Sequence, residues 1–244
     1  MIGIDINCDV GEGIENEEQL MPYISSCNIA CGGHAGNTKS IDDTIALALK
    51  HHVKIGAHPS FPDIENFGRK VLDISASALQ KSIKDQIGLI QERLRKVDEK
   101  LHHIKAHGAL YNLSAIDENT ATVLVKAVQQ TTADVFLYVP YNSVIEKVAL
   151  ANGQKVIYEA FADRNYNNDL SLVSRVQKNA VITDANEVFK HVYQMISQQK
   201  VTTIFGDTLY IKASTYCIHG DNPNAIALLK HLVISLKEKE IQVY

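Results

Sequence analysis

Four histidines in this sequence stand next to glycine or proline, where short strand-like runs end. They are His34, His58, His107 and His219. Imidazole titrates near neutral pH and also binds divalent metals, so four rings in equivalent places offer two kinds of chemistry. They could act as general acid/base groups, or they could bind a metal with Asp9 or Asp221 as an oxygen ligand. Because no H-x-x-x-H or H-E-x-x-H pair falls in a predicted helix, the spacing favours acid/base and substrate-binding roles and leaves a divalent metal possible.

The first strand-like run carries a polar face. Asp5, Asn7 and Asp9 are spaced by two, which places them on one side of a pleated strand, and Glu12 follows between two glycines. Such a face could belong to a solvated edge strand or to a hydrogen-bonded barrel floor. The alternate residues are apolar, so we expect the polar face to point inward and to serve a functional site.

Cationic side chains accompany these groups. Lys105 lies two residues before His107, so both should project from the same face of one strand. Arg69 and Arg164 follow other strand-like or glycine-rich segments and can hold a carboxylate or phosphate through two hydrogen bonds, although each could equally form a loop-stabilising salt bridge. The pattern indicates an anionic substrate.

Short β-rich runs alternate with segments of helical periodicity, which is typical of βα units around a parallel sheet. The predicted strands are 4–8, 26–31, 54–58, 102–107, 135–139, 155–161 and 215–219. The predicted helices are 40–51, 77–99, 118–130, 144–151, 186–198 and 223–239. We expect a single α/β domain over residues 1–244, built as a β/α barrel, with a hairpin at 201–213 outside it. Ser75 and Asp221 are the expected N-caps of two of the helices.

Composition narrows the class of protein. The formal net charge of −4 comes from 24 basic and 28 acidic residues without a long basic run, which makes nucleic acid a poor partner. No signal peptide or membrane span is predicted, so we expect a cytoplasmic protein. The 4 cysteines should remain reduced, and Cys27 and Cys31 lack the second pair that a zinc site would need.

Several longer blocks together resemble the LamB/YcsF lactam-utilisation family. They are DINCDVGEG from Asp5, SCNIACGGHAG from Ser26, IGAHPSFPD from Ile55, FGR from Phe67, HGALYN from His107, EAFADR from Glu159 and CIHGD from Cys217. The resemblance spans nearly the whole chain, but Ala106, Asn66 and Asn179 depart from the family's usual residues. It implies a seven-stranded β/α barrel, TIM-like and of the glycoside hydrolase/deacetylase type. Members of the family include the A component of a bacterial 5-oxoprolinase, which implies ATP-driven opening of 5-oxoproline to glutamate with partner subunits B and C.

The residues and the resemblance together give a set of expected roles. ATP would phosphorylate the ring carbonyl oxygen so that water can attack, with Asp9, His58 or His107 moving protons and Lys105, Arg69 and Arg164 neutralising anions. The expected catalytic residues are Asp9, His58, His107 and Lys105. The expected substrate-binding residues are Asn7, Glu12, Asn28, His34, Arg69, Tyr111, Glu159, Arg164, His219 and Asp221.

Two other interpretations stay open. A metal-dependent hydrolase or carbohydrate deacetylase would use the same histidines and aspartates. A non-catalytic subunit could hold a small carboxylate while its partners do the chemistry. No G-x-x-x-x-G-K-[ST] motif is present, so ATP would bind through another loop or in a partner. A homo-oligomer is also possible.

Overall fold

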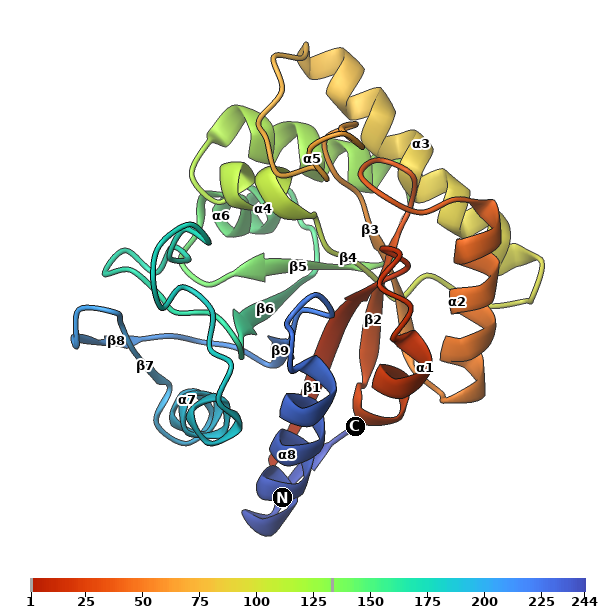
Figure 1. The fold of residues 1–244 in the computed structure, drawn as a ribbon. Helices are drawn as coiled ribbons and strands as arrows, with labels where there is room; N and C mark the ends of the chain where they lie inside the picture. Colours follow the sequence, from red (N-terminus) through yellow and green to blue (C-terminus); the bar gives the residue numbers. More distant parts are fainter. Residues whose placement is uncertain (1, 133) are drawn as a thin grey trace.

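The computed structural model describes residues 2–132 and 134–244, and its centre is a closed barrel of parallel strands (Figure 1). The barrel strands are β1 (Ile2–Val10), β2 (Ser26–Ala30), β3 (Lys54–His58), β4 (His103–Ile104), β5 (Phe136–Pro140), β6 (Val156–Phe161) and β9 (Thr215–Cys217). Each pairs with the next in this order, and β9 pairs with β1 to close the ring. The predicted seven-stranded β/α barrel is therefore confirmed.

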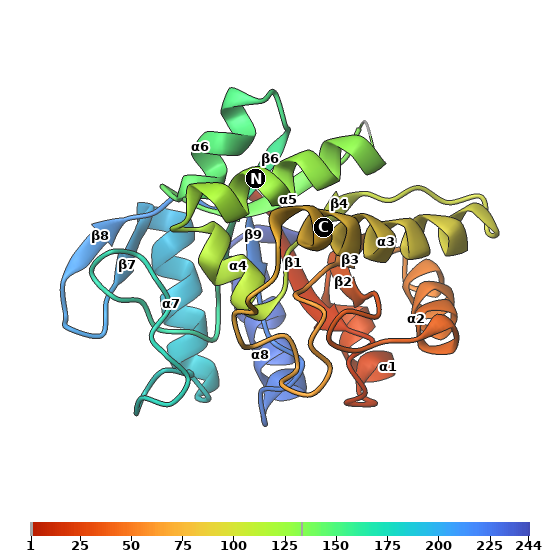
Figure 2. The same ribbon diagram turned by 90° about the horizontal axis from the view of Figure 1, so that it is seen from above.

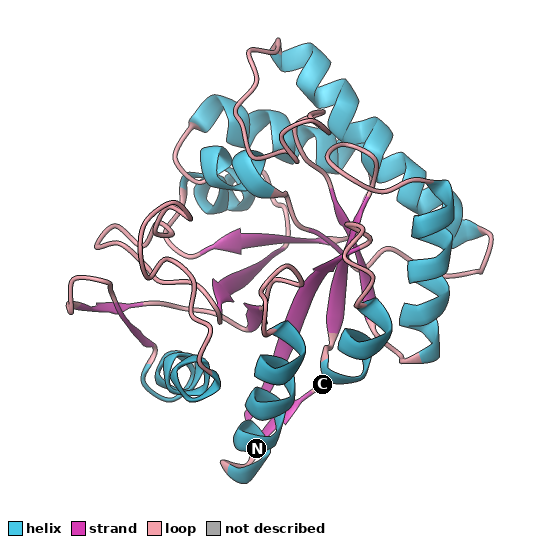
Figure 3. Ribbon diagram, viewed as in Figure 1, coloured by secondary structure: helices cyan, strands magenta, loops and turns pink. Residues whose placement is uncertain are grey.

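Helices surround the barrel on its outside (Figures 1 and 3). They are α1 (Glu17–Leu20), η1 (Met21–Tyr23), α2 (Thr38–Lys50), α3 (Ala76–Arg95), α4 (Gly108–Ser114), α5 (Glu118–Thr131), α6 (Val144–Ala151), α7 (Ala185–Gln198) and α8 (Ala225–Glu238). Their apolar faces pack on the sheet, and among the described residues no helix is both long and apolar enough to span a bilayer. Figure 2, a view turned by 90°, shows α3 and α5 side by side across one part of the barrel.

The strand β4 is shorter than the predicted run 102–107. Its pairing continues irregularly, because Lys105 N donates to Ala57 O at 3.0 Å and His107 N donates to Pro59 O at 2.8 Å. Residues 105–107 therefore stay extended along β3 without forming a regular ladder. This departure lies where Lys105 and His107 enter the functional site.

Two short pairings lie outside the ring. β7 (Lys200–Thr202) and β8 (Thr208–Tyr210) form an antiparallel pair, as predicted, and lie beside α7 away from the barrel (Figure 1). β10 (Ile241–Val243), which was not predicted, pairs with the start of β1 and brings the two chain ends together.

One expected helix cap is correct and the other is wrong. The Ser75 side chain accepts a hydrogen bond from Ala78 N at the start of α3. At α8 the N-cap is Asn224, without a side-chain cap bond, and the helix starts two residues after Pro223. Asp221 does not cap this helix because its carboxylate is held by two arginines instead.

Close packing inside the barrel gives a testable stability difference between two glycines. A Cβ on Gly56 would lie 2.2 Å from His103 Nε2, which belongs to a buried ring and donates to Asn28 Oδ1 at 2.7 Å. We expect Gly56→Ala to lower the free energy of unfolding by about 1–3 kcal/mol through overpacking. The control is Gly88→Ala inside α3, where a Cβ meets nothing within 4 Å.

Because alanine favours the helix over glycine, Gly88→Ala should raise the free energy of unfolding by about 0.5–1 kcal/mol. Urea unfolding of both variants measures the difference. Equal stability of the two variants would show that the ring of His103 has room to move away from strand β3.

Candidate functional site

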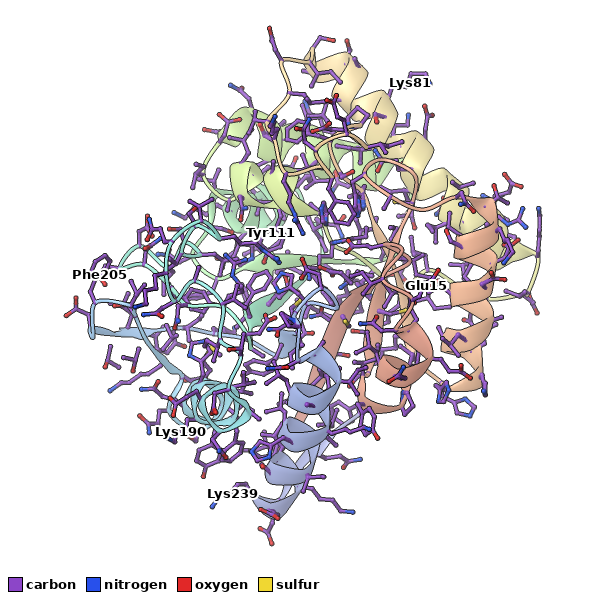
Figure 4. All side chains as sticks on the ribbon, in the orientation of Figure 1. Glu15, Lys81, Tyr111, Lys190, Phe205 and Lys239 are labelled. Carbon is purple, nitrogen blue, oxygen red and sulfur yellow. The ribbon has the colours of Figure 1, made fainter. Side chains whose placement is uncertain are left out.

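A cavity of about 820 Å³ opens at the carboxyl ends of the barrel strands, where β/α barrels place their reactive groups. Among the predicted site residues, those in its wall are Asp9, Glu12, His58, Arg69, Lys105, His107, Tyr111, Glu159, Arg164, His219 and Asp221. Figure 4 shows Tyr111 near the middle of the molecule, whereas Lys81, Lys190 and Lys239 lie at its periphery. The cavity thus brings together side chains from distant parts of the chain.

Three predicted residues lie behind the cavity wall. Asn28 Nδ2 donates to Asn7 Oδ1 and to Asp9 Oδ1, both at 2.8 Å. Asn7 Nδ2 in turn donates to Glu159 Oε1 at 2.9 Å, and His34 Nε2 lies 2.9 Å from Glu12 Oε1. Asn7, Asn28 and His34 therefore contact and position the groups that face the cavity.

Lys105 is the buried cation of the site. Its Nζ lies 3.0 Å from Asp9 Oδ1, 2.9 Å from Glu159 Oε1 and 3.0 Å from Cys217 Sγ. Burial alone would lower the pKa of Lys105, but the negative charges around it outweigh this effect and hold the pKa well above its ordinary value. Lys105 is thus an ammonium group at neutral pH, fixed by two carboxylates from strands β1 and β6.

Asp9 is the buried carboxylate that bridges Lys105 and the histidines. Its Oδ2 lies 3.4 Å from His58 Nε2. Burial would raise the pKa of Asp9, yet His58 and Lys105 outweigh burial and hold the pKa well below its usual range. Asp9 is therefore ionised and has one oxygen, Oδ2, directed toward the imidazoles.

The rings of His34, His58 and His107 form one cluster. His34 stacks on His107 with ring centroids 3.7 Å apart, and His58 Nε2 lies 3.0 Å from His107 Nδ1. Burial is the main reason why the pKa values of His34 and His107 are lowered. These two rings are neutral at physiological pH and can act as lone-pair donors.

His219 is oriented by a buried aspartate that the sequence analysis did not assign. Asp163 Oδ1 accepts from His219 Nδ1 at 2.8 Å, and its Oδ2 accepts from Asn222 Nδ2 at 3.0 Å. Burial would raise the pKa of Asp163, but His219 and Asn222 outweigh it and lower the pKa. The signal for Asp163 was its place next to Arg164 at the end of a predicted strand.

Two arginines hold Asp221 at the cavity mouth. Arg69 and Arg175 donate to Asp221 Oδ2 at 2.8 and 2.7 Å. Arg175 was not predicted, because it lies in an irregular loop where no periodicity marks it. Arg164 lines the cavity, but its guanidinium donates to the carbonyl oxygens of Val173 and Ala180, so it holds that loop over the mouth.

Two groups of side chains offer ligand atoms to a metal ion. Glu12, His34, His58 and His107 each present one such atom, all within 4.8 Å of one another. A second group contains Asp9, Cys217 and His219. The first group fits a divalent metal of the zinc or cobalt kind, because three imidazole nitrogens with one carboxylate suit these ions better than magnesium, calcium or manganese.

Comparison with known proteins shows close relatives over the full length. The LamB/YcsF family profile matches residues 4–244. A protein of Shouchella clausii, named as the A component of 5-oxoprolinase, is 43% identical, with 100% of this chain and 98% of that protein covered. A protein of the same name from Campylobacter jejuni subsp. doylei is 40% identical, with 100% and 97% covered.

Solved structures agree with this relationship. The lactam utilization protein of Thermus thermophilus superimposes with a TM-score of 0.93 at 32% identity, with 99% of each chain covered. The peptidoglycan deacetylase PdaC of Bacillus subtilis, at 10% identity and a TM-score of 0.50 over 99% of this chain and 86% of that chain, shares the fold alone. The profile match and the full-length relatives show that this chain belongs to the LamB/YcsF family.

Proposed function

We propose that this chain is the A component of an ATP-dependent 5-oxoprolinase, which opens the lactam ring of 5-oxo-L-proline to L-glutamate. The names of the full-length relatives support this role. The observation that carries it is the polar cavity floor, where an ammonium, carboxylates and neutral imidazoles meet at the barrel's carboxyl rim. Subunits B and C are the proposed partners, and the cytoplasm is the proposed location.

Two buried polar atoms of the cavity wall suit a lactam. Among the described residues, Glu159 Oε2 and Tyr111 Oη have no hydrogen-bond partner, although both side chains line the cavity. A lactam offers an N–H donor and a carbonyl acceptor about 2 Å apart, a small polar unit that two such atoms can satisfy together. We assign the ring N–H to Glu159 Oε2 and the ring carbonyl to Tyr111 and Lys105.

The proposed reaction consumes one ATP and two water molecules. The ring carbonyl oxygen attacks the terminal phosphorus of ATP, ADP leaves, and the ring carbon becomes an electrophile. Water adds to that carbon and Asp9 takes its proton. The C–N bond then breaks as the ring nitrogen receives both protons of that water molecule, one from Asp9 and one from the hydroxyl group of the adduct. This leaves γ-glutamyl phosphate, which a second water molecule hydrolyses to glutamate and phosphate.

Each proposed catalytic side chain has a role in this sequence. His58 and His107 activate the attacking water, and Lys105 neutralises the negative charge of the phosphoryl group that is transferred to the carbonyl oxygen. ATP enters the cavity through its open mouth. A loop of this chain or a partner subunit binds the nucleotide there. A divalent ion held by Glu12, His34, His58 and His107 would supply Lewis-acid polarisation of oxygen atoms.

The direct experiment measures glutamate formed from 5-oxoproline and ATP. We expect no appreciable glutamate from this chain alone, and stoichiometric glutamate, ADP and phosphate once subunits B and C are added. Omitting ATP should abolish the product. Absence of glutamate with all three subunits and ATP would reject this substrate, and acetate release from an acetylated saccharide would favour the deacetylase alternative instead.

The mouth of the cavity gives a prediction about substrate affinity. The Asp221 carboxylate occupies a place between Arg69 and Arg175 that a substrate carboxylate can take. Each charge-assisted hydrogen bond is worth about 1.5–3 kcal/mol, so Arg69→Ala should raise KM for 5-oxoproline about 10- to 100-fold with a smaller effect on kcat. Steady-state kinetics of the three-subunit enzyme measures both constants.

The matched control is Arg95→Ala at the exposed end of α3, far from the cavity. It should leave KM unchanged. If Arg69→Ala also left KM unchanged, the substrate carboxylate would have to bind elsewhere in the cavity.

A further inference from the structure

Two histidine nitrogens in the site face each other at 3.0 Å, and when both rings are neutral neither nitrogen carries a hydrogen. His58 Nδ1 lies 2.8 Å from Lys105 O, and His107 Nε2 lies 3.0 Å from Phe67 O. A backbone carbonyl can only accept, so each ring places its N–H on that outer nitrogen. The inner nitrogens, His58 Nε2 and His107 Nδ1, therefore both present lone pairs across a distance of 3.0 Å.

Two lone pairs that face each other repel, and a cation between or beside them removes this repulsion. Metal-binding histidines usually donate their other ring N–H to a carbonyl or carboxylate, which fixes the ring and raises its basicity. His58 and His107 both have this arrangement, and both are buried. The backbone thus holds the two rings in the tautomers that a metal ion requires.

Two more ligand atoms complete a compact polyhedron. Glu12 Oε1 lies 2.9 Å from His34 Nε2, 3.4 Å from His107 Nδ1 and 4.0 Å from His58 Nε2. Four ligands about 2.0–2.1 Å from a tetrahedral ion lie about 3.3 Å from one another. The observed separations scatter around this value. The stacked rings of His34 and His107, whose planes are 3° from parallel, would tilt toward each other when both bind an ion.

The local charges also favour a cation. Within the described cluster, the side chains of Asp9, Glu12 and Glu159 are at most 7% exposed. Asp9 and Glu159 share the ammonium of Lys105, whereas Glu12 lies against histidine rings. Uncompensated buried negative charge is costly, and a divalent ion would offset the excess. Asp9 Oδ2, 3.4 Å from His58 Nε2, would then lie next to a water molecule bound to the ion.

We infer that Glu12, His34, His58 and His107 bind one divalent transition-metal ion, of the zinc or cobalt kind. The ion would be the means by which His58 and His107 activate water, with Asp9 accepting the proton. The inference deepens the proposed function, but its test requires neither lactam nor ATP nor partner subunits. A failure of the metal site and a failure of the lactam reaction can therefore be told apart.

The experiment titrates chelator-treated protein with Co²⁺ and Zn²⁺. We expect one ion per chain by elemental analysis and calorimetry, and visible absorption bands of Co²⁺ with nitrogen and oxygen ligands. A ligand that prefers the folded state also raises the melting temperature, by about 5–10 °C at a free ion concentration one hundred times Kd. This shift is measured on the unsubstituted chain, so it does not depend on a variant that folds.

The substitutions His58→Gln, His107→Gln and Glu12→Gln should each weaken binding about 100-fold or more. The control His231→Gln lies on α8 outside the cavity, where His231 Nε2 is 3.4 Å from Ser235 Oγ, and it should bind Co²⁺ like the original chain. The inference is overturned if the original chain binds no stoichiometric ion, or if all three site variants keep its affinity and spectrum.

Discussion

Replacing Lys105 by methionine should lower the free energy of unfolding by about 3–5 kcal/mol and abolish glutamate formation. The size of the effect follows from burial: the Lys105 and Glu159 side chains are 2% and 0% exposed, and Asp9 is 7% exposed. Methionine fills most of the volume of lysine but leaves both carboxylates without their ammonium. The cost is that of uncompensated buried charge and not of a cavity.

Urea unfolding measures this change, with Lys190→Met as the control. Lys190 pairs with Glu187 on the surface of α7, where its side chain is 69% exposed, so the control should change the free energy of unfolding by less than about 0.5 kcal/mol. Adding Glu159→Gln to Lys105→Met should recover part of the loss because it removes one unpaired charge. Equal stability of Lys105→Met and the control would contradict the buried ion network.

Much of the fold could be predicted from the sequence because its signals are local. The alternation of β-rich runs with amphipathic segments predicts the barrel, and a turn around Gly206 predicts the β7–β8 hairpin. The strand β10 was not predicted because Ile241–Val243 is a short run, and its pairing with β1 depends on the other end of the chain. The prediction that Asp221 caps α8 was wrong because Arg69, 152 residues away, binds the Asp221 carboxylate.

Part of the site could also be predicted from the sequence, because some of its signals are local. Histidines that follow strands can be recognised in the sequence, and the closed barrel brings them to one rim. Arg175 acts through a partner far along the chain, so no spacing pointed to it. Asp163 lies next to Arg164 after a predicted strand, but its hydrogen bond to His219, 56 residues away, is visible only in three dimensions. The hydrogen bonds from His58 and His107 to backbone carbonyls, which fix their tautomers, are likewise visible only in three dimensions.

The second large effect concerns His58 and His107. Both line the cavity, both are buried, and their inner nitrogens converge beside Asp9 and Glu12. Under the proposed function, removing either ring deletes a group that activates the attacking water, and such a group contributes about 100- to 10,000-fold in rate. Because the two rings act on one water molecule, the double substitution should cost little more than either single one.

The most direct test is ATP-dependent glutamate formation by the three-subunit enzyme with His58→Ala or His107→Ala in this chain, with His231→Ala as the control. We expect each site variant to assemble with its partners while kcat falls about 100- to 10,000-fold, and we expect the control to keep its rate. Unchanged glutamate production by both site variants would contradict the proposed role of this cavity, because the chemistry would then lie outside it.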